Sequence, residues 1–375
     1  QWLPPLNGHE ETQFWLSKPT QFGPKYADEI RANDHVHCFV NANVTDIQLS
    51  DDLSRTTGFE VTNYLKTRFN VRAKKFIVAS GGLENPRILL NANRQMKAGV
   101  GNQNDVVGRF FADHPHQHLG EFILEDDIRK KAWADTIFSQ GQKGMSLVRG
   151  RFFKPTAEYQ MTQKKLNYSI SFRPAGIKPK PDESSFKSRL RHIICASEAF
   201  RDSAEWVKSG SVTCYGAADG YLKIQSEQEL NPDTRITQST QVDDFGNYRL
   251  NLHWQFTDLD RRTIKEAAYQ VAGVFAKQNI GRVRLENWLL EENIRLPGAG
   301  EGTPSIVAGP HHMCTTRMSD KPEDGVVDQY QRVFGNQNLY IAGSSVFSTG
   351  GFSNPTFTIV QMSLRLADHL KGLPV

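Results

Sequence analysis

Residues 309–320 read GPHHMCTTRMSD, and the segments that follow them decide how the C-terminal part of this 375-residue chain folds. The short apolar strand among these segments, and the Asn-Pro pair that opens a closing helix through Leu370, indicate an α/β arrangement. His311, His312 and Asn354 bring imidazole rings and a neutral amide to this region. The segments are GVVD at 325–328, NLY at 338–340, GSSVF at 343–347 and SNPT at 353–356.

A second stretch, residues 75–90, predicts the edge of a nucleotide-binding sheet. An apolar strand through Ala79 is broken by Ser80-Gly81-Gly82, and a helical segment follows. Glycine lets the backbone approach a ligand closely, and parallel sheets bind ligands beyond the carboxyl ends of their strands. Gly343 and Ser344 end a buried strand in the same way. Taken alone, the glycine pair is better interpreted as a tight turn.

The remaining patterns predict a chain of mixed class, α/β and α+β. Residues 1–108 are expected to form the first part of an α/β domain, with a helix at 24–33, a β-meander to residue 73 and then the strand at 75–79. Residues 109–257 alternate apolar and polar residues in longer segments, which predicts an antiparallel substrate-binding domain. Residues 258–375 begin with a long helix that Asp258 is expected to cap, and then return to the first domain.

Composition excludes several classes of protein. The chain has 45 Lys and Arg against 41 Asp and Glu, a formal charge of +4, and the basic residues are scattered among acidic ones. This distribution argues against nonspecific nucleic-acid binding and favours a small-molecule partner. The apolar runs are too short to span a bilayer. The four cysteines show no CxxC spacing, and Cys195 and Cys214 are either reduced core residues or one local disulfide.

In order and spacing, the C-terminal segments resemble the signature of the glucose–methanol–choline (GMC) oxidoreductases. In that family a His precedes a Thr-x-Arg-Met core, and an Asn-Pro-Thr segment opens the last helix. Further similarity lies in the stretch ASGGLENPRILL at 79–90, in GRF at 108–110 with DHP at 113–115, and in FTD-x-DRR at 256–262. Within the family the chain looks most like the sugar-dehydrogenase and pyranose-oxidase-like branch.

The resemblance implies an enzyme with FAD as its cofactor. The family's catalytic His stands seven residues before the Met of Thr-x-Arg-Met, which points from Met318 to His311 as the general base, with Asn354 as its partner. His312 is left as a structural or supporting residue. The expected cofactor contacts are Val44, Ala79, Gly81, Gly82, Gly343, Ser344, Asn354, Pro355 and Thr356.

The chain also departs from the family pattern. Cys314 and Ser319 stand where the family usually has glycine, which could narrow the backbone near His311. No GxGxxG follows a strand before residue 75, although the family binds the flavin pyrophosphate with that motif. The opening residues, QWLPP, suggest a processed, split or truncated product. We therefore expect the flavin domain to be incomplete without an N-terminal segment or a companion chain that carries GxGxxG, with FAD across the junction.

Two other patterns have alternative interpretations. The alternate histidines of DHPHQH at 113–118 could share one face of a strand and bind a metal, but Asp-His-Pro at this place in the family favours a structural role, so no metal is expected. The basic run KSRLRH at 187–192 could dock an acidic electron-acceptor protein, but a solvated face is the favoured interpretation.

The leading functional prediction is a flavin-dependent oxidoreductase that oxidises a sugar or another polyhydroxylated alcohol. One alternative is a lyase of the same fold, as in the hydroxynitrile lyases, where the histidine does acid–base work only. Another is a non-catalytic subunit that cannot hold FAD by itself. Whether oxygen or another acceptor takes the electrons cannot be predicted from these residues.

Overall fold

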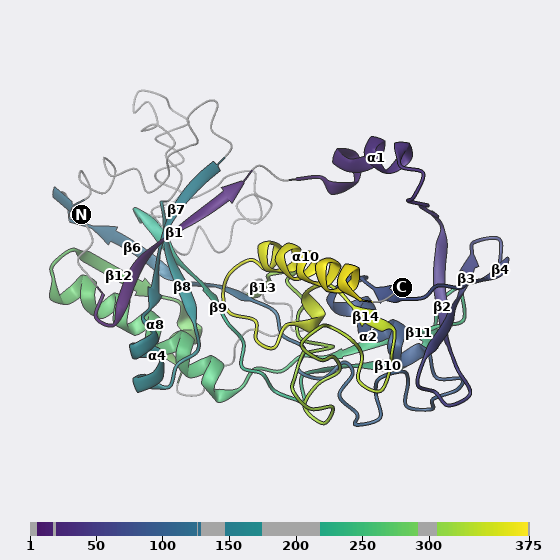
Figure 1. The fold of residues 1–375 in the computed structure, drawn as a ribbon. Coiled ribbons are helices and arrows are strands. Elements are labelled where there is room, and N and C mark those ends of the chain that lie inside the picture. Colours follow the sequence, from purple (N-terminus) through teal and green to yellow (C-terminus); the bar gives the residue numbers. More distant parts are fainter. Residues whose placement is uncertain are drawn as a thin grey trace, which may run out of the picture. The chain divides into compact units, whose positions relative to one another are not determined.

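The computed structural model describes residues 6–17, 20–125, 127–128, 147–174, 218–291 and 306–373, and Figure 1 shows their elements. The chain forms two compact units that interleave along the sequence. Unit 1 comprises Gln1–Ser17, His116–Gln225 and Arg261–Pro297. Unit 2 comprises Lys18–Pro115, Ser226–Asp260 and Gly298–Val375.

Unit 2 is built around a parallel pair of short strands, β5 (Phe76–Val78) and β14 (Leu339–Ile341). After β5 the chain enters α2 (Gly81–Asn91), and after β14 it makes a 3₁₀ turn, η1 (Ser344–Val346). The closing helix α10 (Thr356–Gly372) packs Leu366 beside Tyr340 of β14. The predicted strand, glycine turn and helix are therefore confirmed, together with the mixed α/β class.

Further elements of unit 2 surround this pair. Three strands form the predicted meander, namely β2 (Ala42–Leu49), β3 (Thr56–Asn63) and β4 (Arg68–Val71). A separate hairpin consists of β10 (Arg235–Val242) and β11 (Tyr248–His253). The other described elements are α1 (Phe22–Ala32), in which no residue is buried, and β13 (Ile306–Ala308).

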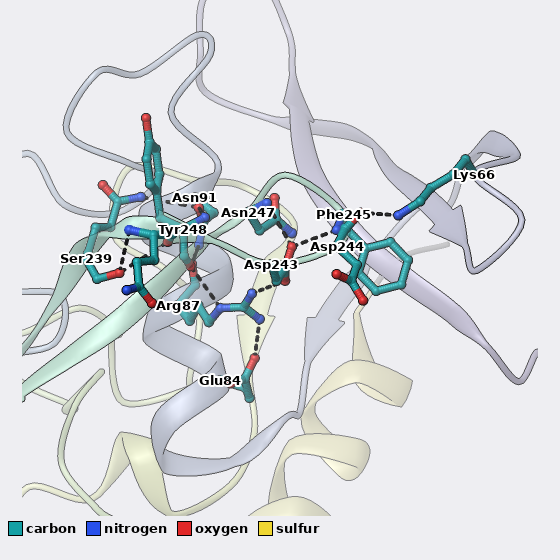
Figure 2. A network of polar contacts seen from close by, with 12 residues as sticks. Lys66, Glu84, Arg87, Asn91, Ser239, Asp243, Asp244, Phe245, Asn247 and Tyr248 are labelled. Carbon is teal, nitrogen blue, oxygen red and sulfur yellow. Dashed lines mark hydrogen bonds and ion pairs between the residues drawn. The ribbon is translucent and has the colours of Figure 1, made fainter.

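A polar network joins the β10–β11 hairpin to α2 (Figure 2). Arg87 donates to Glu84 at 2.8 Å, to Asp243 and to the carbonyl of Tyr248 at 3.1 Å. Burial raises the pKa of Asp243, but N–H donors in the hairpin turn and the Arg87 guanidinium lower it overall. On the other side of the turn, Lys66 donates to the Asp244 carbonyl. The alternation of apolar and polar residues predicts that this hairpin belongs to the substrate-binding domain of residues 109–257, whereas its contacts place it in unit 2.

Unit 1 is an antiparallel sheet with helices. The strands lie in the order β1 (His9–Ser17), β7 (Leu147–Pro155), β8 (Tyr168–Pro174), β9 (Gly220–Ser226), β6 (Pro115–Leu124) and β12 (Gly281–Leu285). The long helix α8 (Asp258–Lys277) packs Phe275 against Phe122 of β6 and Phe172 of β8, with ring centroids 5.8 and 5.9 Å apart. The short helices are α4 (Ala157–Gln163) and α9 (Asn287–Leu290). This antiparallel pairing agrees with the antiparallel sheet that the alternation of apolar and polar residues predicts.

The N-terminus of α8 corrects one prediction. Asp258 is the first helical residue, not the cap. The Thr257 hydroxyl oxygen accepts from the Asp260 N–H at 3.2 Å, and the Asp260 carboxylate accepts from the Thr257 N–H at 2.7 Å. This reciprocal pair satisfies two backbone donors, so Thr257 is the favoured cap.

Some sequence-based expectations fall outside the described residues, namely the basic run at 187–192 and the pair Cys195 and Cys214. Among the residues described, no helix is both long and apolar enough to cross a bilayer.

Candidate active site

The carboxyl ends of β5 and β14 come together beside the start of α2. Gly81 has φ +89°, and a Cβ built there would meet no atom within 4 Å. Gly343 has φ +111°, and its Cβ would lie 3.9 Å from the Gly81 Cα. Only glycine adopts such backbone angles readily. The structure therefore brings together Ala79, Gly81, Gly82, Gly343 and Ser344 at one pair of strand ends, with open space next to Gly81.

Gly82 has a different reason to be glycine. A Cβ at this position would stand 2.2 Å from the His312 carbonyl oxygen, a distance that real contacts do not reach. The Thr315 hydroxyl donates to the Gly82 carbonyl at 2.7 Å, and the Ser344 hydroxyl donates to the His312 carbonyl at 2.7 Å. Residues 312–315 are thus held directly against the first turn of α2.

Asn85 joins the two strand ends and was not singled out by the sequence analysis. Its side chain is fully buried. The Oδ1 atom accepts from Ser80 N–H at 2.6 Å, while Nδ2 donates to the Ala342 carbonyl at 2.9 Å and to the Ser345 hydroxyl at 2.7 Å. The neighbours of Asn85 in the sequence are Glu84 and Pro86, so the pattern gives no sign that this amide is buried and therefore needs partners.

The structure accommodates Cys314 at the position where the family usually has glycine. The residue is fully buried and has φ +69°, the left-handed region that glycine favours. The Cys314 N–H still donates to the Ser344 carbonyl at 3.2 Å, so the backbone follows η1 with cysteine in place. Burial raises the pKa of the Cys314 thiol to about 12, which leaves it protonated and unreactive at neutral pH.

His311 lies at the start of this segment, half-buried, and contacts a second histidine. Its Nδ1 atom is 3.0 Å from Nδ1 of His114, and the two rings meet edge to face. One oxygen of Asp113 accepts from the backbone N–H groups of both histidines, at 2.9 Å from His311 and 2.6 Å from His114. Burial lowers the pKa of His311 below its ordinary value, while the nearby Asp113 opposes that shift and His312 adds to it.

His312 faces a different environment. Its ring packs against Phe111, with centroids 5.8 Å apart, and its carbonyl accepts the Ser344 hydroxyl described above. Phe111 in turn packs edge to face against Trp254. The adjacent histidines therefore differ: the His311 ring contacts the ring of His114, and the His312 ring contacts that of Phe111.

The loop before α10 carries the predicted partner of His311. Asn354 is exposed, Pro355 occupies the cap position of α10 and is buried, and Thr356 is the first helical residue. Upstream in the same loop, the Gly350 carbonyl lies 3.2 Å from Nε2 of His114, and the Gly351 N–H donates to Glu227 at 3.1 Å. The loop is thus attached to the residue that contacts His311.

Val44 lies apart from the glycine cluster in sequence, on β2, where it is half-buried and opposite Val61. Its strand packs against α2.

The alternate histidines of residues 113–118 have different neighbours, since His114 contacts His311 whereas His118 stacks on Tyr221 with centroids 4.5 Å apart. No group of three metal-ligating side chains occurs in the described parts of the chain.

Comparisons with known proteins confirm the family resemblance. Residues 231–363 match the family model described as GMC oxidoreductase. The fructose dehydrogenase large subunit of Gluconobacter japonicus is 27% identical over 324 residues, which cover 86% of this chain and 51% of the relative. The 2-methyl-1,2-propanediol dehydrogenase of Mycolicibacterium austroafricanum is 24% identical over 369 residues, covering 95% and 57%.

A solved structure shares the fold. An FAD-dependent oxidoreductase from Chaetomium thermophilum superposes with a TM-score of 0.52 at 15% identity, covering 93% of this chain and 64% of that one. The chain spans about half the length of the curated relatives it matches.

Proposed function

We propose that this chain is part of an FAD-dependent oxidoreductase that oxidises a CH–OH group of a sugar or another polyhydroxylated alcohol. The observation that carries the proposal is the contact between two features, an open, glycine-lined pair of strand ends and the histidine-bearing segment held against it. The names of the relatives, a fructose dehydrogenase and a propanediol dehydrogenase, support this substrate class.

The residues around the strand ends fit a flavin. Gly81 leaves open space where any side chain would project, and Gly343 keeps its backbone close beside it. We propose that Ala79, Gly81, Gly82, Gly343 and Ser344 contact FAD there, that Asn354, Pro355 and Thr356 border it from the start of α10, and that Val44 contacts its adenine end. When bound, FAD supplies the hydride acceptor for alcohol oxidation.

His311 is the proposed general base. Because its pKa lies below the ordinary value of 6.5, the ring is neutral at pH 7 and has a lone pair available. Positioned beside the substrate, that lone pair takes the hydroxyl proton. Asn354 is exposed, and its amide can both donate to and accept from a substrate oxygen, so we assign it the task of orienting the reacting carbon.

Unit 2 also carries a surface that fits a further segment of a flavin domain. Parallel sheets are normally covered on both faces, yet β5 and β14 form a sheet of two strands and the central residue of β5, Ile77, is 44% exposed. On α10, Phe357 and Leu364 lie one above the other and are 75% and 56% exposed. We propose that this outer face, defined as Ile77, Phe357 and Leu364, is covered by a segment with a GxGxxG turn, in the same protein or in a companion chain.

The experiment that tests the proposed function is anaerobic addition of substrate to the flavin-containing protein. A sugar or polyol should bleach the flavin absorbance band, and analysis of the product should show a carbonyl compound with two hydrogens fewer. An unchanged spectrum across a broad panel of sugars and alcohols would overturn the proposal. Carbon–carbon bond cleavage without bleaching would instead indicate the lyase.

A further inference from the structure

A continuous series of hydrogen bonds runs from His311 to a carboxylate within unit 2. Nδ1 of His311 is 3.0 Å from Nδ1 of His114, and Nε2 of His114 is 3.2 Å from the Gly350 carbonyl oxygen. The next N–H, that of Gly351, belongs to the same peptide group as this carbonyl and donates to Glu227 Oε1 at 3.1 Å. Two histidines, one peptide group and one carboxylate are therefore connected.

The direction of each hydrogen bond in this series follows from chemistry. A carbonyl oxygen can only accept, so Nε2 of His114 must carry the proton that it shares with Gly350. The His114 side chain is fully buried, and burial lowers the pKa of His114 to about 4 although the Gly350 carbonyl opposes that shift. A neutral imidazole has a single N–H. Nδ1 of His114 is consequently an acceptor, and His311 must donate its own Nδ1–H to it.

We propose that His114 is a positioning residue that fixes His311 in the Nδ1–H tautomer, so that Nε2 of His311 is the unprotonated nitrogen, the one that can act as a base. The inference rests on the proposed role of His311 as general base. Neutral imidazole in water favours the opposite tautomer, with the proton on Nε2, which could not act as a base at that atom. Proteins usually select one tautomer of a histidine by a hydrogen bond to one of its ring nitrogens, which fixes the nitrogen that carries the proton.

The rest of the series holds His114 in place. Asp113 accepts from the backbone N–H groups of both histidines through one oxygen, which fixes the two residues relative to each other. Glu227 bonds one end of the Gly350–Gly351 peptide group and polarises it, so the carbonyl at the other end becomes a stronger acceptor for His114. Negative charge at the end of the series also favours the imidazolium that forms when His311 takes the substrate proton.

Nitrogen-15 NMR of the full chain with labelled histidine tests this directly, since protonated and bare imidazole nitrogens differ strongly in chemical shift. The His311 signals are identified by their loss in His311→Ala. At pH 7.5 the wild-type protein should show a protonated Nδ1 and a bare Nε2 at His311. A protonated Nε2 at His311 would overturn the proposal without any variant being needed.

Two variants of His114 separate positioning from mere packing. His114→Phe keeps a ring but removes both nitrogens, so the His311 signals should shift toward the Nε2–H tautomer, and flavin reduction should slow by about 10- to 100-fold. His114→Gln offers a carbonyl to His311 and an amide N–H to Gly350, and should restore most of the wild-type tautomer and rate. His118→Phe, the same change at the exposed histidine that stacks on Tyr221, should alter neither.

These readouts distinguish the two proposals. If His311→Ala reduces flavin as fast as wild type while the tautomer depends on His114, the proposed function fails and the positioning role stands. If His311→Ala is slow but His114→Phe leaves both tautomer and rate unchanged, the positioning role fails. If His114→Phe does not fold, the wild-type tautomer and the His114→Gln spectrum still decide.

Discussion

Two regions of unit 2 differ in how far their side chains are buried and hydrogen-bonded. One is the junction, by which we mean the contacts of Asn85, Thr315 and Ser344 between the strand ends, α2 and the histidine-bearing segment, and the other is the outer face of β5 and α10. At the junction, the side chains of Asn85, Thr315 and Ser344 are buried and each makes hydrogen bonds within the chain. The outer face, Ile77, Phe357 and Leu364, presents apolar side chains to solvent. The polar groups of the junction are paired within the described part of the chain, whereas the outer face leaves large apolar side chains exposed.

The largest expected effect is on the rate of flavin reduction, at His311 in the segment that the junction holds. His311→Ala should slow flavin reduction by substrate roughly 100-fold to 10,000-fold, the usual contribution of a positioned general base. The matched variant His312→Ala should cost much less, because that ring contacts Phe111. Stopped-flow absorbance gives both rate constants, with bound flavin measured first. If the two variants behave in the reverse order, the catalytic assignment moves to His312.

The junction itself should be sensitive to loss of its central amide. Asn85→Ala leaves the Ser80 N–H and the Ala342 carbonyl without their partner inside the protein. The buried Ala342 carbonyl should cost about 1–3 kcal/mol when orphaned and the N–H of the exposed Ser80 less, so the free energy of unfolding should fall by about 2–4 kcal/mol. Urea titration followed by circular dichroism measures it. Asn104→Ala, which removes an exposed hydrogen bond to Pro322, is the control and should change stability by less than about 1 kcal/mol.

Sequence patterns predicted the elements of both regions but not the contacts that finish the junction. Strand alternation and glycine turns are local, so β5, α2 and β14 could be located from neighbouring residues. Asn85 bonds the Ala342 carbonyl 257 positions away, and His114 meets His311 across 197 positions. A contact at that separation depends on the finished fold. From the sequence, His114 is therefore only part of an Asp-His-Pro motif with a structural role, and nothing local connects it with His311.

Local ambiguity accounts for a smaller error. Thr257 and Asp258 are adjacent, and both residue types cap helices well, so the pattern alone could not choose between them. The choice depends on Asp260, whose carboxylate also accepts from Glu229 N–H at 2.8 Å and thereby fixes the start of α8 one residue earlier. The exposure of Leu364 could not be predicted either, because an apolar residue in a helix is usually expected to pack against the rest of the protein.

The pH dependence of flavin reduction tests the assignment of His311 as the general base. Burial lowers the pKa of His311 below 6.5, and only the neutral ring can accept a proton. The rate constant for flavin reduction should therefore rise with pH and level off, with a midpoint below 6.5, and fall about tenfold per pH unit under that midpoint. The charge of Asp113 raises this pKa, while His312 lowers it and His114 shares a hydrogen bond.

Asp113→Asn is the matched variant for this profile. It keeps an oxygen for the two backbone N–H groups and removes the charge, so the midpoint should move to lower pH. A midpoint above 6.5 in wild type, or a shift to higher pH in the variant, would contradict the assignment of the profile to His311.

The smallest effect should come from the outer face, where two leucines of one helix can be compared. Leu364 is 56% exposed and Leu366 is 3% exposed, although they are two residues apart on α10. In this chain by itself, Leu364→Ala should change the free energy of unfolding by about 0.5 kcal/mol or less, whereas Leu366→Ala should cost about 2–5 kcal/mol. Urea titrations of the two variants measure the difference. If a GxGxxG segment covers the face, as proposed, Leu364→Ala should become more costly once that segment is present, because the side chain is then buried. An equal, small effect with and without the segment would show that the outer face is not where it packs.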